Sequence, residues 1–311
     1  MRLFLKVINY FFFLIKKKIP NKLLILLGLN LIYKSRIFYE KYYVLEDAEN
    51  KIFSQNGEDG IIDFIVQRLG LRKPTFVEIG VGDYSEANTR LIYEMYYSRG
   101  LIVDLVNNFK DKVSINVNLW RGNLNVVERK VTSQNINSLL KEYFPHPIDL
   151  FSIDIDGIDY WIIKELREKI SKIFILEYNS IFGSEIEISV PNINNFSRKE
   201  YHYSNLCFGA SIKAYVKLMD QKGYYLLGVN RLRNNAFFIN KDYPKLNFFP
   251  RIKEIDEKEM TNLNFSESRD QNGHLSYLDK NEGLKQILDC DIVDLSNNSN
   301  KKFKLKSVLK I

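Results

Sequence analysis

The sequence predicts an α/β fold: a Rossmann-like, mostly parallel sheet of seven strands, with an N-terminal helical segment and a C-terminal extension. Between residues 76 and 177, short apolar and β-branched runs alternate with stretches of helical periodicity. This is the pattern of a parallel sheet covered by helices on both faces. Several of these runs end in a carboxylate. Gly80 and Gly82 follow the first run, and glycine lets the main chain turn sharply and approach a ligand closely.

The first two strands and the helix between them have the spacing of a nucleotide-binding βαβ unit. Phe76 to Ile79 is the first strand and carries Glu78, and residues 86–95 are predicted as the crossover helix. The second strand, residues 100–103, ends at Asp104, about 22 residues after the glycines. Such units place an acid against ribose hydroxyls at this distance. Asp104 is therefore predicted to contact a ribose; the alternative is a solvated residue at a strand end.

The remaining elements continue the alternation as far as a terminal hairpin. They are strand 125–132, helix 135–143, strand 148–157, helix 160–170, strand 172–177, helix 210–221, and strands 224–229 and 236–239. The last two strands are too close together for a crossover connection, so we expect an antiparallel pair. Five strands in βα alternation followed by a hairpin match the seven-stranded sheet of S-adenosylmethionine-dependent methyltransferases.

Five short motifs follow one another in a specific order. They are SQNGED at residues 54–59, FVEIGVGD at 76–83, NT at 88–89, GLIVD at 100–104 and IDIDG at 153–157. Over residues 52–240 their order and spacing resemble the FkbM-type methyltransferase family. Two positions depart from the family pattern: residues 81–84 read VGDY where many relatives have alanine-asparagine-aspartate-glycine, and Asp104 stands where many have glutamate-proline.

The resemblance implies a binding site for S-adenosylmethionine in the loops that follow the strands. The expected cofactor-binding residues are Gln55, Asp59, Glu78, Gly80, Gly82, Asp83, Asp104 and Thr132. Gln55 and Asp59 belong to the polar SQNGED loop, which the resemblance places over the cofactor. The alternative is that Ser54 or Asn56 caps the helix predicted at 61–69, with acids in its first turn that suit the helix dipole.

Methyl transfer to a hydroxyl needs an aligned acceptor and a group that removes its proton. Asp154 and Asp156 follow the fourth strand, and Glu177 ends the fifth. We predict a general base here, first Asp156 and second Asp154, with its basicity raised by the neighbouring carboxylate. Two alternatives remain: a Mg²⁺ site formed by Asp154, Glu177 and Asn179, or carboxylates that only accept hydrogen bonds from backbone.

The acceptor is predicted from the segment of residues 180–208, where such folds insert substrate-binding loops. It is rich in asparagine and tyrosine, which bind sugars through hydrogen bonds and ring stacking, and it contains His202 as a further catalytic candidate. The expected activity is O-methylation of a sugar hydroxyl in a cell-surface glycan or its precursor. Two alternatives are a metal-dependent glycosyltransferase, in which Asp154 and Asp156 form a D-x-D motif, and a non-catalytic glycan-assembly protein.

Composition excludes several classes of protein. The chain has 311 residues, a formal net charge of +7 and two cysteines, Cys207 and Cys290, without C-x-x-C spacing. This argues against a zinc site, an iron–sulfur site or a disulfide scaffold, and favours a reducing, cytoplasmic location. No nucleic-acid-binding motif accompanies the basic residues, so nucleic acid is not expected as a partner. The oligomeric state is not predicted.

Three regions are expected: an N-terminal segment, residues 1–50; a methyltransferase-like domain, residues 51–245; and a C-terminal extension, residues 246–311, with a disordered tail at 296–306. The apolar runs 3–15 and 23–31 flank Lys16-Lys17-Lys18 and are too short to span a bilayer. We expect residues 1–40 to anchor the protein at a membrane surface, on the inner membrane face. The alternative is a helix packed on the domain or on a partner protein.

Overall fold

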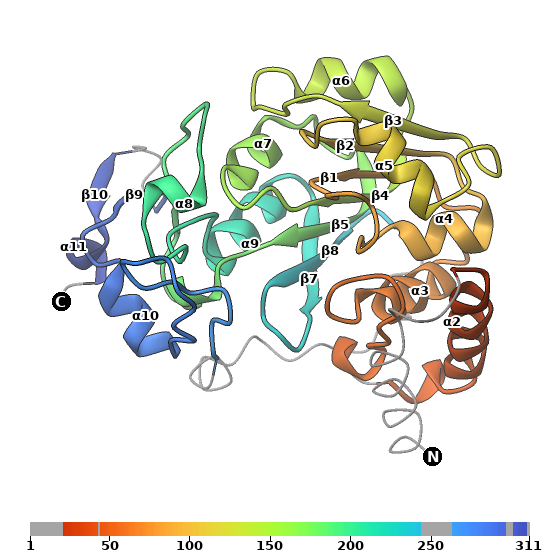
Figure 1. The fold of residues 1–311 in the computed structure, drawn as a ribbon, viewed down its shortest axis with the longest axis horizontal. Helices are drawn as coiled ribbons and strands as arrows, with labels where there is room; N and C mark the ends of the chain where they lie inside the picture. Colours follow the sequence, from red (N-terminus) through yellow and green to blue (C-terminus); the bar gives the residue numbers. More distant parts are fainter. Residues whose placement is uncertain (1–20, 43, 244–262, 297–300, 310–311) are drawn as a thin grey trace. The chain divides into compact units, whose positions relative to one another are not determined.

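The structure, a computed structural model, describes residues 21–42, 44–243, 263–296 and 301–309 (Figure 1). Residues 1–20, which include half of the expected anchor, therefore lie outside the described residues. The chain divides into two compact units. The first contains Met1–Lys130, Ile148–Ser152 and Tyr243–Ile252, and the second contains Val131–Pro147, Ile153–Asp242 and Lys253–Ile311.

The main sheet has seven strands in the order β3-β2-β1-β4-β5-β8-β7. Its strands are β1 (Phe76–Ile79), β2 (Gly100–Asp104), β3 (Leu124–Glu128), β4 (Ile148–Ile153), β5 (Ser171–Glu177), β7 (Tyr224–Val229) and β8 (Asn235–Asn240). β1 pairs with β2, and β2 with β3, in parallel. β8 runs antiparallel to both β5 and β7. The predicted Rossmann-like sheet with a terminal antiparallel hairpin is confirmed.

The helices of the first unit are α2 (Asn21–Arg36), α3 (Glu58–Arg68), α4 (Arg90–Tyr96) and α5 (Phe109–Asn116). α2 packs on the unit through Leu31 and Ile32, which are buried beside Ile52, Phe53 and Leu91. Its Gly28 is buried, and a Cβ at this position would lie 2.5 Å from Ile52 Cγ2. A larger residue at position 28 would therefore force α2 away from the unit. Among the described residues, no helix is long and apolar enough to cross a membrane.

The second unit contains α6 (Ile136–Tyr143), α7 (Asp159–Glu165), α8 (Arg198–Tyr201), α9 (Ile212–Gln221), α10 (Lys280–Gln286) and α11 (Leu305–Leu309). It also contains a smaller sheet of order β10-β9-β6, formed by β6 (Ile188–Ser189), β9 (Asp291–Asp294) and β10 (Lys302–Lys304). β9 pairs antiparallel with both neighbours. The small sheet joins residues of the 180–208 segment to the C-terminal extension.

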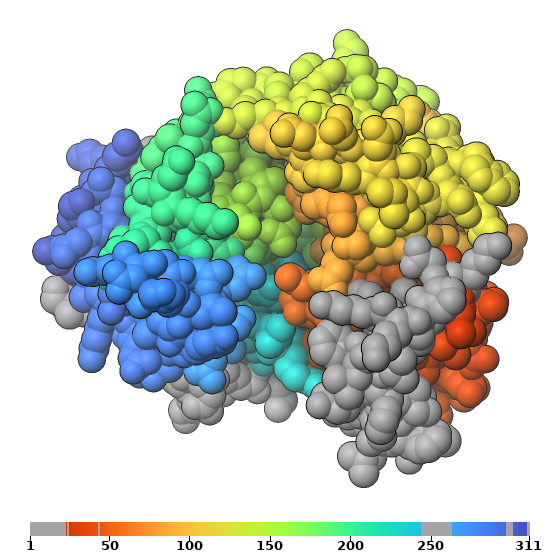
Figure 2. Space-filling view, viewed as in Figure 1, coloured from red at the N-terminus to blue at the C-terminus, as the bar shows by residue number. Residues whose placement is uncertain are grey.

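The structure differs from the sequence prediction in the C-terminal tail. Residues 302–309 form β10 and α11, and Leu305 is fully buried beside Ile188 and Ile292 in the core of the small sheet. The prediction of disorder is therefore wrong for this part of the tail. In Figure 2 the described C-terminal residues, in blue, lie against the green segment of residues 180–208.

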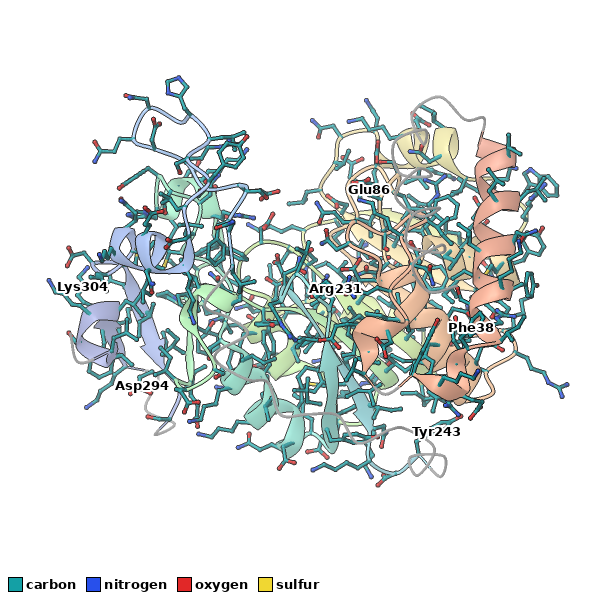
Figure 3. All side chains as sticks on the ribbon, turned by 90° about the horizontal axis from the view of Figure 1, so that it is seen from below. Phe38, Glu86, Arg231, Tyr243, Asp294 and Lys304 are labelled. Carbon is teal, nitrogen blue, oxygen red and sulfur yellow. The ribbon has the colours of Figure 1, made fainter. Side chains whose placement is uncertain are left out.

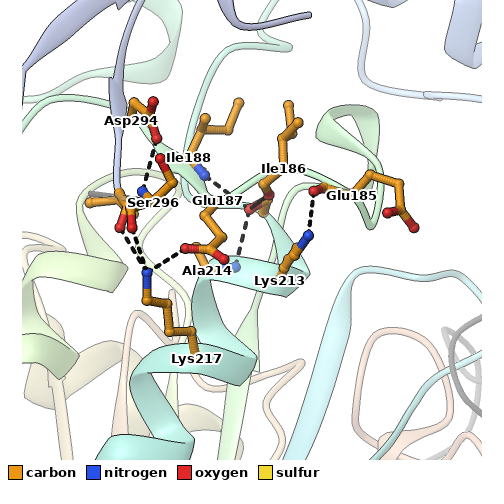
Figure 4. Close-up of polar contacts among 11 residues, drawn as sticks. Glu185, Ile186, Glu187, Ile188, Lys213, Ala214, Lys217, Asp294 and Ser296 are labelled. Carbon is orange, nitrogen blue, oxygen red and sulfur yellow. Dashed lines mark hydrogen bonds and ion pairs between the residues drawn. The ribbon is translucent and has the colours of Figure 1, made fainter. Parts of the chain in front are cut away.

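Polar contacts also connect the C-terminal extension to α9. The ammonium of Lys217 donates hydrogen bonds to Glu187 Oε2 at 2.6 Å and to the carbonyls of Leu295 and Ser296 at 3.2 and 3.1 Å (Figure 4). Nearby, Lys213 donates to the carbonyl of Glu185. Because these partners come from the residues before β6 and after β9, one helix holds the ends of these two neighbouring strands.

Candidate functional site

The loop after β1 is held to the end of β2 by Asp104. Its Oδ2 accepts hydrogen bonds from the backbone N–H groups of Val81, at 2.7 Å, and Gly82, at 2.8 Å, and its Oδ1 accepts one from Leu105. Gly80 and Gly82 have φ values of +81° and +58°, a region that favours glycine. A Cβ on Gly82 would meet no described atom within 4 Å. The loop is thus fixed on one side and open on the other.

Glu78 organises the chain that follows this loop. Its Oε1 accepts a hydrogen bond from the N–H of Asn88, and its Oε2 accepts from the N–H and hydroxyl of Thr89 at 2.9 and 2.6 Å. Burial raises the pKa of Glu78 to about 7, against the effect of these donors. Since Glu78 binds the backbone just before α4, that helix begins at Arg90 rather than at the predicted residue 86. In the structure, the buried carboxylate of Glu78 thus holds the backbone between the glycine loop and α4.

The SQNGED loop is closed by its own aspartate. Asp59 Oδ2 accepts hydrogen bonds from the backbone N–H groups of Ile52, Phe53 and Ser54 and from the Ser54 hydroxyl, at 2.7 to 2.8 Å. Asp59 is fully buried, which raises its pKa to about 6. Gln55 is exposed. Asp59 thus shapes the loop, and Gln55 is the member of this predicted pair that is accessible to a ligand.

Arg90 connects three segments of the first unit and was not predicted as a site residue. Its guanidinium donates to the carbonyls of Ser85, at 2.7 Å, and Asn116, at 2.8 Å, and lies 4.3 Å from the ring centroid of Phe53. Asn116 in turn donates to the carbonyl of Asp83. The sequence carries no signal for this role, because the partners lie 5, 26 and 37 positions away. Arg90 therefore connects the residue before the SQNGED loop with the residues after the glycine loop.

Two further residues that were predicted to bind the cofactor, Asp83 and Thr132, make local hydrogen bonds in the structure. Asp83 is exposed, and its Oδ1 accepts a hydrogen bond from the N–H of Ser85. Thr132 belongs to the second unit, where its N–H donates to Asn135 Oδ1 just before α6. Asp83 lies in the glycine loop, and Thr132 lies in the turn that precedes α6; a cofactor contact of either residue stays a prediction.

The second unit contains an acidic cluster formed by Asp154, Asp156 and Glu177. Carboxylate oxygens of all three lie within 4.8 Å of one another, and Asp154 and Glu177 share a hydrogen bond between their side chains. Burial, followed by repulsion from the neighbouring acids, raises the pKa of both groups, that of Asp154 to about 8. Both groups therefore favour the protonated form more than an exposed carboxyl group does. The sequence correctly predicted that these strand-end acids meet.

Asp156 differs from Asp154 because it is paired with a cation. Arg198 forms ion pairs with Asp156 and, at 3.1 Å, with Glu267. Its Nε donates to the carbonyl of Asn205, and its guanidinium lies 4.3 Å from the centroid of the Phe208 ring. Burial alone lowers the pKa of Arg198, but the surrounding acids raise it overall. Asp156 is thus held as an ion pair, in a left-handed backbone conformation with φ of +54°.

Asp159 supports the turn that carries these aspartates. Its carboxylate accepts hydrogen bonds from the N–H groups of Ile155, at 2.9 Å, and Gly157, at 3.0 Å. Asp159 is buried, which raises its pKa to about 6. The sequence analysis missed this residue, although an acid two positions after the IDIDG motif, in the first turn of a helix, is a usable signal.

Asn179 and His202 are engaged away from the acidic cluster. The Asn179 amide donates to the carbonyls of Leu206 and Phe208 at 2.8 and 3.0 Å, and its oxygen accepts from the N–H of Ile181. His202 Nδ1 lies 2.7 Å from the Ser204 hydroxyl, and its ring packs on Tyr203. Burial lowers the pKa of His202. The Asn179 amide thus holds the surrounding backbone, and His202 has the contacts of a loop histidine; the metal-ligand role of Asn179 and the catalytic role of His202 stay predictions.

Solved structures of methyltransferases are similar to this chain. The pyocyanin biosynthetic protein PhzM is 16% identical, with 57% of this chain and 53% of that protein covered and a TM-score of 0.34. An O-methyltransferase family protein from Burkholderia thailandensis is 9% identical, with 60% and 59% covered and a TM-score of 0.35. An S-adenosylmethionine-dependent methyltransferase from Clostridium acetobutylicum is 11% identical, with 68% and 97% covered and a TM-score of 0.39.

The similarity is partial. The chain spans only 53% and 59% of the length of the first two of these proteins. A scan against protein-family models and a search of curated proteins find no match to this chain. The assignment of the fold therefore stands on the strand order and strand directions of the main sheet.

Proposed function

We propose that this protein is an S-adenosylmethionine-dependent methyltransferase. The observation that carries the proposal is the glycine loop after β1, which is open beside Gly82 and bound through its backbone to the carboxylate of Asp104 at the end of β2. In open α/β sheets, ligands bind beyond the carboxyl ends of the strands. The solved methyltransferases of similar fold agree with this proposal without establishing it, since a fold does not by itself imply a function.

The residues of the first unit fit this cofactor. Each carboxylate oxygen accepts more than one hydrogen bond, so Asp104 can hold the loop and also accept from ribose hydroxyls. The open side of Gly82 leaves room for a ligand next to the main chain. Asp104, Gly80 and Gly82 would hold the cofactor, while Glu78, Asp59 and Arg90 keep the surrounding loops in place. When bound, S-adenosylmethionine supplies an electrophilic methyl group.

Within the acidic cluster, Asp154 is the better candidate for the general base. Its raised pKa, about 8, is close to the pH at which a base is most effective. Asp156, the first choice from sequence, is already engaged in an ion pair with Arg198. In the proposed reaction, Asp154 takes the proton of the acceptor hydroxyl, and Glu177 stabilises the resulting carboxyl group by their shared hydrogen bond.

The same cluster does not fit Mg²⁺ well. A divalent cation needs oxygen ligands that are free to coordinate it, but Asp154 and Glu177 are hydrogen-bonded to each other and Asp156 is paired with Arg198. A metal would have to displace both. We therefore assign no step to Mg²⁺.

We propose a sugar hydroxyl of a glycan or its precursor as the acceptor. The support is the chain between β6 and α8, which exposes Asn192, Asn194 and Asn195 to solvent. Exposed amides donate and accept hydrogen bonds, as polyhydroxylated ligands require. This assignment extends the methyltransferase proposal and is tested separately from it.

The first test is calorimetric titration of the full-length chain with S-adenosylmethionine, S-adenosylhomocysteine and a nucleotide-sugar. Micromolar binding of the two methionine cofactors, reduced at least about tenfold in Asp104→Ala, supports the proposal. Asp111→Ala is the matched control, because Asp111 is an exposed aspartate on α5. Binding of the nucleotide-sugar alone would contradict the proposal and favour a glycosyltransferase, and binding of none of the three would favour a non-catalytic protein.

A further inference from the structure

α2 has an apolar face that stays exposed among the described residues. Leu23, Leu26, Leu27 and Tyr33 are 45%, 63%, 38% and 58% exposed, and Ile37, just after the helix, is 74% exposed. Positions 23, 26, 27, 33 and 37 lie on one side of a helix with 3.6 residues per turn. We call these five residues the outer stripe. In Figure 3, where Phe38 marks the end of α2, side chains of this helix project away from the rest of the first unit.

The charge of the chain is concentrated in the same region. The first 39 residues contain eight lysines and arginines and no acidic residue, whereas residues 40–311 contain 37 basic and 38 acidic side chains. The net charge of +7 therefore comes entirely from the first 39 residues. Lys34 is exposed on α2 itself. An exposed apolar patch marks an interaction site, and here it belongs to a part of the sequence that has eight basic and no acidic residues.

We infer that α2 docks through the outer stripe on a membrane surface that contains anionic lipids. Leucine and aromatic side chains enter the boundary between headgroups and acyl chains, and nearby lysines are attracted to anionic headgroups. The other face of α2 packs on the first unit. This packing favours a helix that lies along the surface. A second copy of the chain fits less well, because it would bring like charges together.

The inference can be tested with the full-length chain and lipid vesicles. Vesicles of equal parts phosphatidylcholine and phosphatidylglycerol should sediment the protein, and vesicles of phosphatidylcholine alone should sediment much less, because the cations lose their anionic partner. Leu26→Asp should weaken binding at least ~10-fold, because a charge replaces an inserted apolar side chain. Leu232→Asp is the matched control: this leucine is 56% exposed in the loop between β7 and β8 and should leave vesicle binding unchanged.

Several results would overturn the inference. Wild-type protein that remains in the supernatant with anionic vesicles would do so, as would Leu26→Asp protein that sediments like wild type. Sedimentation equilibrium measures self-association without lipid. A dimer that dissociates in Leu26→Asp, together with absent vesicle binding, would assign the outer stripe to a second copy. Circular dichroism of both variants verifies that they are folded, since both positions are exposed.

Discussion

Two aspartates separated by one residue have different chemistry in this protein. Asp154 is hydrogen-bonded to Glu177 and has a raised pKa, and Asp156 forms an ion pair with Arg198. A carboxyl group that is protonated near neutral pH becomes a base when it loses that proton, whereas a carboxylate beside a guanidinium is stabilised in its charged form. The turn that separates their environments is held by Asp159 and includes the left-handed backbone of Asp156.

Asp154→Asn should reduce methyl transfer by ~100-fold or more while cofactor affinity stays within a few-fold, because the amide cannot accept the proton. Single-turnover transfer and calorimetric binding measure the two effects. In the wild type, the rate should rise as pH increases toward about 8, where Asp154 loses its proton. Asp220→Asn is the control, since Asp220 is an aspartate on α9 paired with Lys241. Full activity in Asp154→Asn would remove this residue from the mechanism.

Gly82→Val should weaken S-adenosylmethionine binding by at least ~30-fold, about 2 kcal/mol, because the new side chain occupies the open side of the loop. The matched control is Gly273→Val. Gly273 also has positive φ, +83°, and no described atom within 4 Å of an added Cβ, so both variants carry similar backbone strain. Equal affinity in the two variants would show that the ligand does not lie against Gly82.

At the scale of elements, the small sheet shows how distant parts of the chain make one core. β6 has only two residues, and β10 consists of three exposed ones, so neither strand is stable alone. The core beneath them combines Ile188 and Cys207 with Ile292 and Leu305. The 180–208 segment thus depends on the C-terminal extension for its conformation.

Leu305→Ala should lower the free energy of unfolding by about 2–5 kcal/mol, because it leaves a cavity in this core. Phe303→Ala serves as the control: Phe303 lies two residues earlier and is 38% exposed, so its loss should cost much less. Urea unfolding followed by circular dichroism measures both. Equal small effects would mean that the residues after β9 contribute little to the core.

At the scale of the whole molecule, buried acids make stability depend on pH. The pKa values of Asp59, Glu78, Asp154 and Asp159 are raised to about 6, 7, 8 and 6, against about 4 in an unfolded chain. The folded protein therefore binds more protons than the unfolded chain between pH 4 and 8. The stabilisation that these acids contribute is complete below their pKa values in the unfolded chain. It is lost as the pH rises through their pKa values in the folded protein.

We therefore expect the free energy of unfolding to fall between pH 5 and pH 8. Glu78 alone would contribute a change of up to about 3 kcal/mol, from its shift above the ordinary glutamate value. Urea unfolding at intervals across this range measures the slope. Glu78→Gln, which does not titrate, should have a shallower slope than wild type. A wild-type stability that rises with pH would contradict the assigned burial of these groups.

Much of the fold and part of the site could be predicted from sequence. The main sheet was predictable because its strands are local apolar runs such as Phe174 to Leu176 in β5, and the meeting of Asp154 with Glu177 follows from strand ends in a sheet. The small sheet was not, because Lys302 to Lys304 reads as a polar tail and pairs with β9 only in the folded chain. The role of Arg198 likewise depends on tertiary contacts, 42 positions from Asp156.

The shared core of the small sheet has a consequence for exchanging parts between related proteins. Under the proposed function, residues 180–208 would bind the acceptor, and they fold against residues 263–296 and 301–309. A transplant of the first segment alone would remove Ile188, Leu206 and Cys207 from their packing partners and leave a mismatched interior. Both segments would have to be transferred together. We therefore expect substitutions in residues 180–208 and in the C-terminal residues that pack on them to occur together in related proteins.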